Sequence, residues 1–221
     1  MTKNNRLKIA IDSPAAAGAG TVAKEISKHY NLFYLDTGKI YRYIAYLKIY
    51  YTKEYNLKYV KDKIKKLKIS TLHNKKLISD KIGTEASIIS KNKKIRKIVH
   101  KLQIDFAYNP PKKFKGACLD GRDITYNIIP DADFKFFITA NVTTRAKRRF
   151  KELKHLKSNI SLTEVLKSIK KRDKSDYNRK IAPLKKTKDS ILINTSNLTK
   201  RACFLKIKKI IDRKLKLHGN I

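Results

Sequence analysis

A run of small residues follows the first apolar segment of the chain. It reads Ser13, Pro14, Ala15, Ala16, Ala17, Gly18, Ala19, Gly20 and Thr21. A strand, a loop of small side chains and a helix start together form a nest of backbone N–H groups, and the helix dipole adds to its attraction for anions. The segment predicts a phosphate site, in which the Thr21 hydroxyl caps the helix or lies near Mg²⁺.

The loop departs from the usual phosphate-loop pattern at two positions. Ser13 stands where the first glycine is expected, and Ala19 where the lysine is expected. On the loop alone, a plain strand-to-helix turn would be the simpler interpretation. Phosphate binding would also need cations from elsewhere in the chain. Arginine suits phosphate better than lysine because its planar guanidinium group makes two parallel contacts.

Short apolar runs alternate with helical patterns along the chain. The runs that predict buried strands are residues 7–11, 32–35, 116–119, 134–138 and 191–193. Strands separated by helices indicate an α/β fold with a doubly wound parallel sheet of about five strands. A final helix is expected from about Thr199, with Ala202, Leu205 and Ile210 buried.

Two stretches fit this alternation poorly. Residues 71–84 predict a hairpin with its turn near Asn74 and Lys75, and residues 145–179 are a basic helical excursion. A capping box of Ser161 and Glu164 starts one helix in the second stretch. Both are expected as insertions at the carboxyl edge of the sheet, where ligands bind in this architecture.

The composition has two interpretations. A net charge of +36 in 221 residues favours a polyanion partner, or lysine spread over solvated surfaces. The second is favoured because the lysines occur throughout the chain, and no nucleic-acid module or aromatic stacking motif is present. Cys118 and Cys203 predict buried free thiols. The polar start and the lack of a long apolar span predict a cytoplasmic protein without membrane contact.

The chain resembles bacterial cytidylate kinases in seven further segments that follow the loop in the family's order. They are residues 35–42 (LDTGKIYR), 77–87 (LISDKIGTEAS), 95–96 (IR), 120–123 (DGRD) with 130–132 (PDA), 137–140 (FITA), 145–149 (RAKRR) and 172–184 (RDKSDYNRKIAPL). The resemblance runs from Ile9 to about Asp212. Every matched cation at a substrate position is arginine, although lysine greatly outnumbers arginine in the chain.

The resemblance implies phosphoryl transfer from ATP to CMP or dCMP, with Mg²⁺ accompanying ATP. It implies one domain over residues 1–221, with a core of 6–42, 100–144 and 180–221, a CMP-binding insertion at about 43–99, and a lid at about 145–179. A monomer is expected, and no specific nucleic-acid partner.

The resemblance also assigns roles to residues on the acceptor side. Arg42, Arg122 and Arg179 would hold the CMP phosphate, and Ser87, Arg96 and Asp123 would recognise cytosine. Arg172 and Asp176 would contact the sugar, with Asp36 and Thr37 beside the acceptor. Structural alternatives stay open: an ion pair of Asp123 with Arg122 or Arg96, a salt bridge of Arg172 with Asp176 four residues on, and a helix cap at Asp36. Tyr41 supports the pocket or lies in the core.

On the donor side, the loop from Ser13 to Thr21 would bind ATP together with Arg145 and Arg149. Arg148 would act with Arg122 and Arg179 on the transferring phosphoryl group. A solvated helix face is the alternative for at least one lid arginine.

The alanine at position 19 leaves three explanations open. The chain is a degenerate kinase, a laboratory Lys-to-Ala variant, or an enzyme in which another cation has taken over, for which Lys39 is the hypothesis. The second departure at Ser13 argues against a single engineered change. Gly83 and Ser175 also replace residues that are often arginine in the family. The alternative functions are a nucleotide-binding pseudokinase of very low turnover and, less favoured, a basic nucleic-acid-binding protein.

Overall fold

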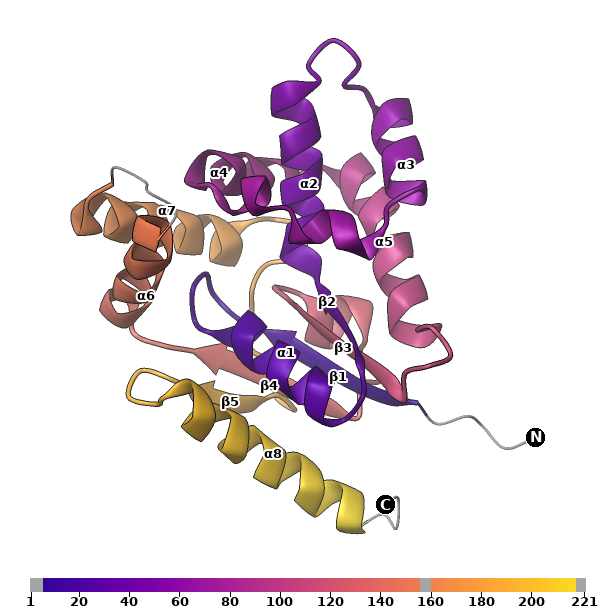
Figure 1. Cartoon of the computed structure of the whole chain (residues 1–221), viewed down its shortest axis with the longest axis vertical. Helices are drawn as coiled ribbons and strands as arrows, with labels where there is room; N and C mark the ends of the chain where they lie inside the picture. The colour runs from indigo at the N-terminus through magenta and orange to yellow at the C-terminus, as the bar shows by residue number, and fades with distance from the viewer. Residues whose placement is uncertain (1–5, 156–159, 218–221) are drawn as a thin grey trace.

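A five-stranded parallel sheet runs through the middle of the molecule in the computed structural model, which describes residues 6–155 and 160–217 (Figure 1). Its strands are β1 (Leu7–Asp12), β2 (Phe33–Asp36), β3 (Gly116–Gly121), β4 (Phe134–Thr139) and β5 (Ile191–Asn194). They lie in the order β2-β3-β1-β4-β5, and every pairing is parallel. The predicted α/β fold and its five strands are confirmed.

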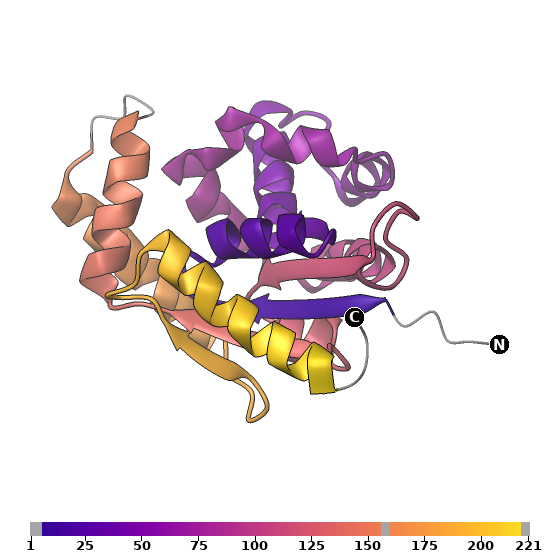
Figure 2. The same cartoon turned by 60° about the horizontal axis from the view of Figure 1, so that its bottom comes forward.

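Both faces of the sheet are covered, which explains the continuous apolar runs of its strands. In β1, Ile9 and Ile11 pack on one side and Ala10 on the other, and all three are fully buried. Helices α1 (Ala19–His29) and α8 (Lys200–Leu217) cover the first side (Figure 2). Helices α2 (Thr37–Tyr50) and α5 (Lys93–Tyr108) cover the second.

The predicted hairpin at residues 71–84 is wrong. The segment forms two short 3₁₀ helices, η1 (Ile69–His73) and η2 (Lys75–Ile78), and then enters α4 (Asp80–Ile89). Side chains between these turns bind the backbone locally: Asn74 accepts from the Lys76 amide at 2.9 Å, and Ser79 caps α4. Such local bonds replace a strand ladder, and Leu72 and Leu77 are both buried. Helix α3 (Leu57–Lys65) precedes this segment.

Helices α6 (Val142–His155) and α7 (Leu162–Asn178) form a pair with its own small apolar cluster. Ala146 and Leu153 of α6 pack there with Val165 and Ile169 of α7. The predicted capping box of Ser161 and Glu164 is confirmed at the start of α7. Residues 156–159 of the predicted lid lie outside the described residues, as do 1–5 and 218–221 of the predicted domain.

Helix α8 begins one residue after the predicted start, but its buried face is different. Cys203, Ile207 and Ile211 are buried, whereas Leu205 is 47% exposed and Ala202 and Ile210 are half-buried. The buried residues recur every four positions, so the apolar stripe is rotated relative to the predicted one. Of the helices described, none is long and apolar enough to span a membrane.

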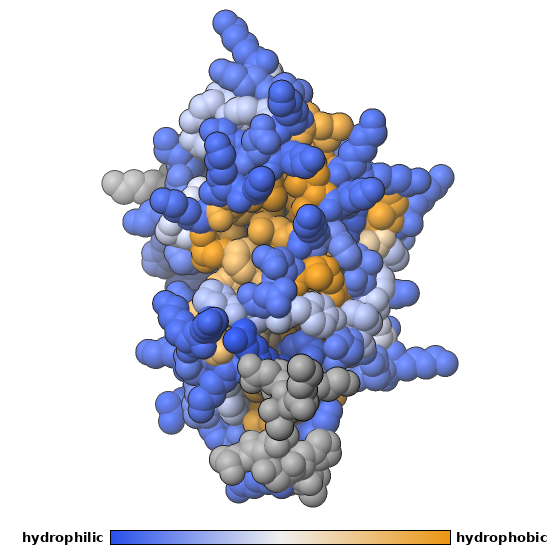
Figure 3. Space-filling view, turned by 90° about the vertical axis from the view of Figure 1, so that its right-hand side faces the viewer, coloured by the Kyte–Doolittle hydropathy of each residue, from blue (hydrophilic) through white to orange (hydrophobic). Residues whose placement is uncertain are grey.

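One face of the molecule is largely hydrophilic (Figure 3). On the face drawn in Figure 3, hydrophilic side chains project over most of the surface, and apolar patches lie between them. Both predicted thiols, Cys118 and Cys203, are buried and free.

The carboxylate of Asp12 joins the end of β1 to the short π-helical turn η3 (Ile124–Ile128). It accepts from the amides of Ile124 at 2.7 Å and Thr125 at 3.0 Å, and from the Thr125 hydroxyl at 2.6 Å. Burial outweighs these bonds and raises the pKa of Asp12 to about 6. The folded protein therefore binds this proton more tightly than the unfolded chain does.

This shift predicts a pH-dependent contribution to stability. The contribution is fully present below the unfolded pKa near 3.8 and is lost as pH rises through about 6. We expect the difference in unfolding free energy, wild type minus Asp12→Asn, to fall by about 2 kcal/mol between about pH 4.5 and 7.5. Urea titrations of both proteins across that range measure this difference. The contributions of the other carboxylates are the same in both proteins and cancel in it. A flat difference would contradict the prediction.

Candidate active site

A cavity of about 740 Å³ lies at the carboxyl edge of the sheet, and the whole stretch from Ser13 to Val22 lines it. β1 ends beside β3, and the Ser13 amide donates to the Gly121 carbonyl at 3.1 Å, which fixes the start of the loop. The predicted phosphate loop therefore forms a wall of this cavity. The opposite parts of the lining come from α2, α4, β3, α6, α7 and the start of α8.

The loop leads into α1 earlier than predicted. Gly18 is the N-cap with φ 88°, and the helix begins at Ala19, so the prediction that Thr21 caps the helix is wrong. Gly18 adopts this left-handed conformation without steric cost because glycine has no Cβ. Ala16 also has a left-handed φ of 60°, which costs a residue with a Cβ about 1 kcal/mol. The methyl groups of Ala17 and Ala19 pack into the core.

The cavity gathers five of the predicted arginines: Arg42, Arg122, Arg148, Arg149 and Arg172. Three more, Arg96, Arg145 and Arg179, are buried in ion pairs and are not among the residues described as lining it. Lys39, the predicted substitute for the loop lysine, is not among the lining residues described either. Its amide donates to Asp36 at 3.2 Å, which confirms that Asp36 caps α2; Asp36 also lines the cavity.

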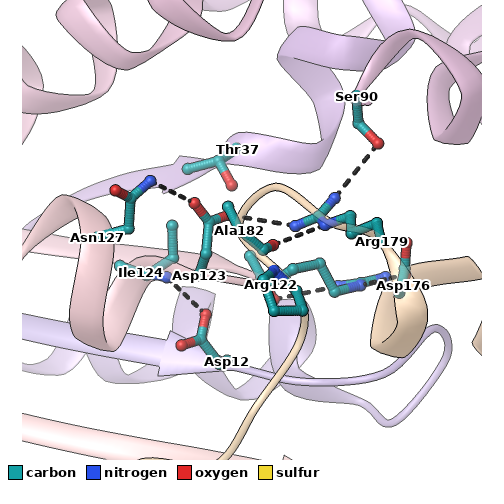
Figure 4. A network of polar contacts seen from close by, with 12 residues as sticks. Asp12, Thr37, Ser90, Arg122, Asp123, Ile124, Asn127, Asp176, Arg179 and Ala182 are labelled. Atoms are coloured by element: carbon teal, nitrogen blue, oxygen red, sulfur yellow. Dashed lines mark hydrogen bonds and ion pairs between the residues drawn. The ribbon is translucent and has the colours of Figure 1, made fainter. Parts of the chain in front are cut away.

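Asp123 lies at the centre of a buried polar network (Figure 4). Its carboxylate is 2.5 Å from Arg96 and 3.5 Å from Arg179, and it accepts from the Asn127 amide at 2.7 Å. Of the two predicted ion-pair partners, Arg96 is therefore correct and Arg122 is not. Arg179 also donates to the Ala182 carbonyl at 2.6 Å, which ties the end of α7 to the next segment.

Arg122 pairs with Asp176 instead, with 2.8 Å between Nε and Oδ2 (Figure 4). Burial opposes the charged form of Arg122, but the Asp176 carboxylate outweighs it and the pKa is raised. The predicted salt bridge of Arg172 with Asp176 does not form. The Nε of Arg172 is buried with no hydrogen-bond partner among the described residues, and burial lowers its pKa to about 10. Arg172 is thus a guanidinium that can still take an anion.

Arg42 reaches the cavity from α2 and is held by the segment before α4. It donates to the carbonyls of Leu77 at 2.7 Å and Ser79 at 3.1 Å. A Cβ at Gly83 would lie 2.8 Å from its Nη2, so the departure from arginine at position 83 leaves room for Arg42. Burial lowers the pKa of Arg42 to about 9. The hydroxyls of Ser87 and Ser175 lie 3.3 Å apart, which joins α4 to α7.

The three arginines of the predicted lid have different surroundings. Arg145 forms a two-pronged ion pair with Asp173, at 3.0 and 2.6 Å. Arg149 pairs with Asp80 and with Glu152, both at 2.8 Å. Arg148 instead bonds to uncharged groups at the loop and at the end of β5. The basic segment is therefore not a uniformly solvated helix face.

The sequence motif at residues 120–123 suggested roles for Arg122 and Asp123 but none for Asp120. Asp120 lines the cavity and accepts from the Tyr34 hydroxyl at 3.2 Å. Burial and the neighbouring Asp36 raise the pKa of Asp120 well above its usual range. Thr37 donates to the backbone carbonyl of Asp120 at 2.7 Å. The position of Asp120 at the end of a strand was the sequence signal that could have identified it as a site residue.

Tyr41 belongs to the core. Its ring packs in the larger cluster, its hydroxyl has no partner among the described residues, and the Arg96 guanidinium lies 5.8 Å from the ring centre.

With the predicted phosphate loop before α1 as a wall of the arginine-lined cavity, the molecule has the fold of P-loop nucleoside monophosphate kinases. The crystal structure of an uncharacterized protein from Eubacterium ventriosum has the same fold, with a TM-score of 0.56 and 17% identity, and the match covers 93% of this chain and 98% of that one.

The family model for cytidylate kinase matches residues 9–213, and the chain belongs to that family. A cytidylate kinase of Bartonella tribocorum is 41% identical over 95% of this chain and 96% of its own length. One of Clostridium botulinum is 40% identical over 94% and 98%, and one of Mesomycoplasma hyopneumoniae is 38% identical over 95% of each. The protein is thus a kinase, a nucleotide-binding enzyme of the transferase class.

Proposed function

We propose that the protein transfers the γ-phosphoryl group of ATP to CMP or dCMP, giving ADP and CDP or dCDP. The observation that carries this proposal is the shared cavity. The phosphate loop lines one part of it, and Arg42, Arg122 and Arg172 line another. Two anions must be held close together for this reaction, and fixed cations offset their repulsion.

On the acceptor side, Arg42, Arg122 and Arg179 would hold the CMP phosphate, with Arg172 and Asp176 at the sugar. Asp123 would accept from the exocyclic amine of cytosine, with Ser87 and Arg96 beside it. A carboxylate offers about four acceptor sites, and Asp123 uses three, for Arg96, Arg179 and Asn127. Uracil presents a carbonyl at that position, so a carboxylate disfavours it.

On the donor side, the backbone N–H groups of the loop from Ser13 to Thr21 would bind the ATP phosphates. The CMP phosphate oxygen attacks the γ-phosphorus in line, and no covalent bond to the enzyme forms. The guanidinium groups stabilise the charge spread over the transferring group. We propose residues 145–179 as the lid that excludes water, residues 43–99 as the CMP-binding insertion, and a cytoplasmic monomer.

The side chains present fit a Mg²⁺ ion that arrives with ATP. Mg²⁺ takes oxygen ligands, keeps several waters, and is usually held by one or two carboxylates together with substrate phosphates. Thr21, Asp36 and Asp120 provide such oxygens in the same cavity. The described residues contain no group of three or more His, Cys, Asp or Glu that could hold a metal unaided. When bound, the ion neutralises charge on the phosphates.

A nucleotide-binding pseudokinase is the second candidate, and the composition of the loop favours it. Ala19 offers no cation, and losing one transition-state donor costs about 10²–10³-fold in rate. Ala16 adds backbone strain at the place where the loop must approach phosphate.

A coupled ADP-release assay with Mg·ATP and CMP, dCMP, UMP or AMP distinguishes the two, run beside Ala19→Lys. We expect turnover selective for CMP and dCMP in the unaltered protein. Turnover that occurs only in Ala19→Lys would favour the pseudokinase. If neither protein released ADP and CMP gave no thermal stabilisation, the proposed phosphoryl transfer to CMP would be refuted.

A further inference from the structure

We propose that Arg148 supplies the phosphate-binding charge that Ala19 lacks, and that Thr195 is the positioning residue that holds Arg148 against the loop. This inference rests on the proposed function and deepens it. It replaces the hypothesis that Lys39 takes over from the missing lysine.

The guanidinium of Arg148 reaches the loop from α6. Its Nη1 is 3.4 Å from the carbonyl oxygen of Ala17. A Cβ built on Gly18 would lie 3.7 Å from the same nitrogen. Ala17 and Gly18 directly precede Ala19, and all of them line the cavity together with Arg148. The cation therefore lies beside the missing lysine's position in the chain.

Thr195 connects this guanidinium to the sheet. It follows β5, is 2% exposed, and its hydroxyl donates to the Ala17 carbonyl at 2.9 Å. The same hydroxyl accepts from Arg148 Nη1 at 2.9 Å, and the Thr195 carbonyl accepts from Nη2 at 2.7 Å. One buried residue thus holds the loop and the arginine at once. Such fixed donors are what stabilise charge that develops in a transition state.

The charge of Arg148 is not offset by a bonded carboxylate. Among the described contacts its partners are Ala17 and Thr195, both uncharged. Arg145 also reaches the loop, at the Ala15 carbonyl, but it is paired with Asp173. Of the arginines that contact the loop among the described residues, Arg148 is therefore the one with charge to offer an incoming phosphate.

A lysine at position 19 would compete with Arg148 for the same task, since both positions line one cavity. The two cations should then be partly redundant, and a double-mutant cycle measures that redundancy. The four proteins are wild type, Arg148→Ala, Ala19→Lys and the double variant. kcat and the KM values for ATP and CMP are measured for each, with CMP-induced thermal shift as the check on folding and acceptor binding.

We expect Arg148→Ala to lower kcat by about 10²–10³-fold while the CMP KM changes less than about threefold. In the Ala19→Lys background the same substitution should lower kcat by less than about tenfold. Thr195→Val should lower kcat by about tenfold in wild type and by less in the Arg148→Ala background, where the bond to Arg148 is already gone and the bond from the Thr195 hydroxyl to the Ala17 carbonyl is left to lose. Thr195→Ser keeps the hydroxyl and should retain wild-type activity. Lys147→Ala, on the exposed side of α6, is the matched control and should match wild type.

Equal losses in both backgrounds, or no loss from Arg148→Ala, would overturn the inference. A wild type that binds CMP but does not turn over would also overturn it, because no compensation would then exist. A wild type that neither turns over nor is stabilised by CMP would refute the proposed function itself.

Discussion

Replacing Arg122 with alanine is expected to lower kcat/KM for CMP by about 10³-fold. Arg122 lines the cavity, and its Nε is fixed by Asp176 at 2.8 Å, so its fork is preorganised for an incoming phosphate. Its removal takes away a transition-state donor and also removes a positive charge that acts on the nearby carboxylates of Asp176, Asp120 and Asp36. Steady-state kinetics with varied CMP at saturating ATP measure the loss.

Two variants separate charge from geometry. Arg122→Lys keeps the charge without the planar fork and should recover only part of the activity. Arg213→Ala removes an exposed arginine on α8 and should leave the kinetics unchanged. If Arg122→Ala stayed within tenfold of wild type while the acceptor remained bound, Arg122 would not be a catalytic residue.

Replacing Asp123 with asparagine is expected to lower the free energy of unfolding by about 3–5 kcal/mol. Asp123 is 4% exposed and lies between Arg96 and Arg179, so the variant leaves two buried guanidinium groups without their carboxylate. Urea denaturation measures the change. The preference for CMP over UMP should fall at least about tenfold, since the site loses an acceptor for the cytosine amine.

Asp131→Asn is the matched control for this change. Its carboxylate is 56% exposed and pairs with Lys8 at 3.5 Å, so its loss should cost less than about 1 kcal/mol. Equal destabilisation by both substitutions would mean that the Asp123 network adds nothing beyond a surface pair. An unchanged CMP-to-UMP ratio in a folded Asp123→Asn protein would remove Asp123 from base recognition.

The strands were predictable because they are buried on both faces, which leaves continuous apolar runs such as 7–11 and 134–138. The segment at 71–84 was not, because Leu72 and Leu77 suit a hairpin and two 3₁₀ turns equally well. The outcome there depends on Asn74 and Ser79 bonding to nearby amides. Periodicity does not report such bonds.

Motif order predicted which residues would gather at the site, but not which would pair. Asp176 lies four residues after Arg172, and that spacing favoured a helical salt bridge. The structure gives Asp176 to Arg122, 54 positions away. Likewise, nothing in the basic segment separates Arg148 from Arg145 and Arg149. Tertiary contacts with Thr195, Asp173 and Asp80 distinguish them.

The lysine-rich surface has a kinetic consequence. Carboxylates are few in this chain, and several of them, including Asp36, Asp120, Asp123 and Asp176, lie at the arginine-rich end of the sheet rather than on the outside. Lysines therefore outnumber acidic side chains on the exterior, and the surface has a positive electrostatic potential. Anionic nucleotides approach faster through such a field, and the gain falls with ionic strength because the Debye length is about 8 Å at 0.15 M salt. The same field retards anionic products as they leave, so added salt would slow nucleotide capture and speed product release.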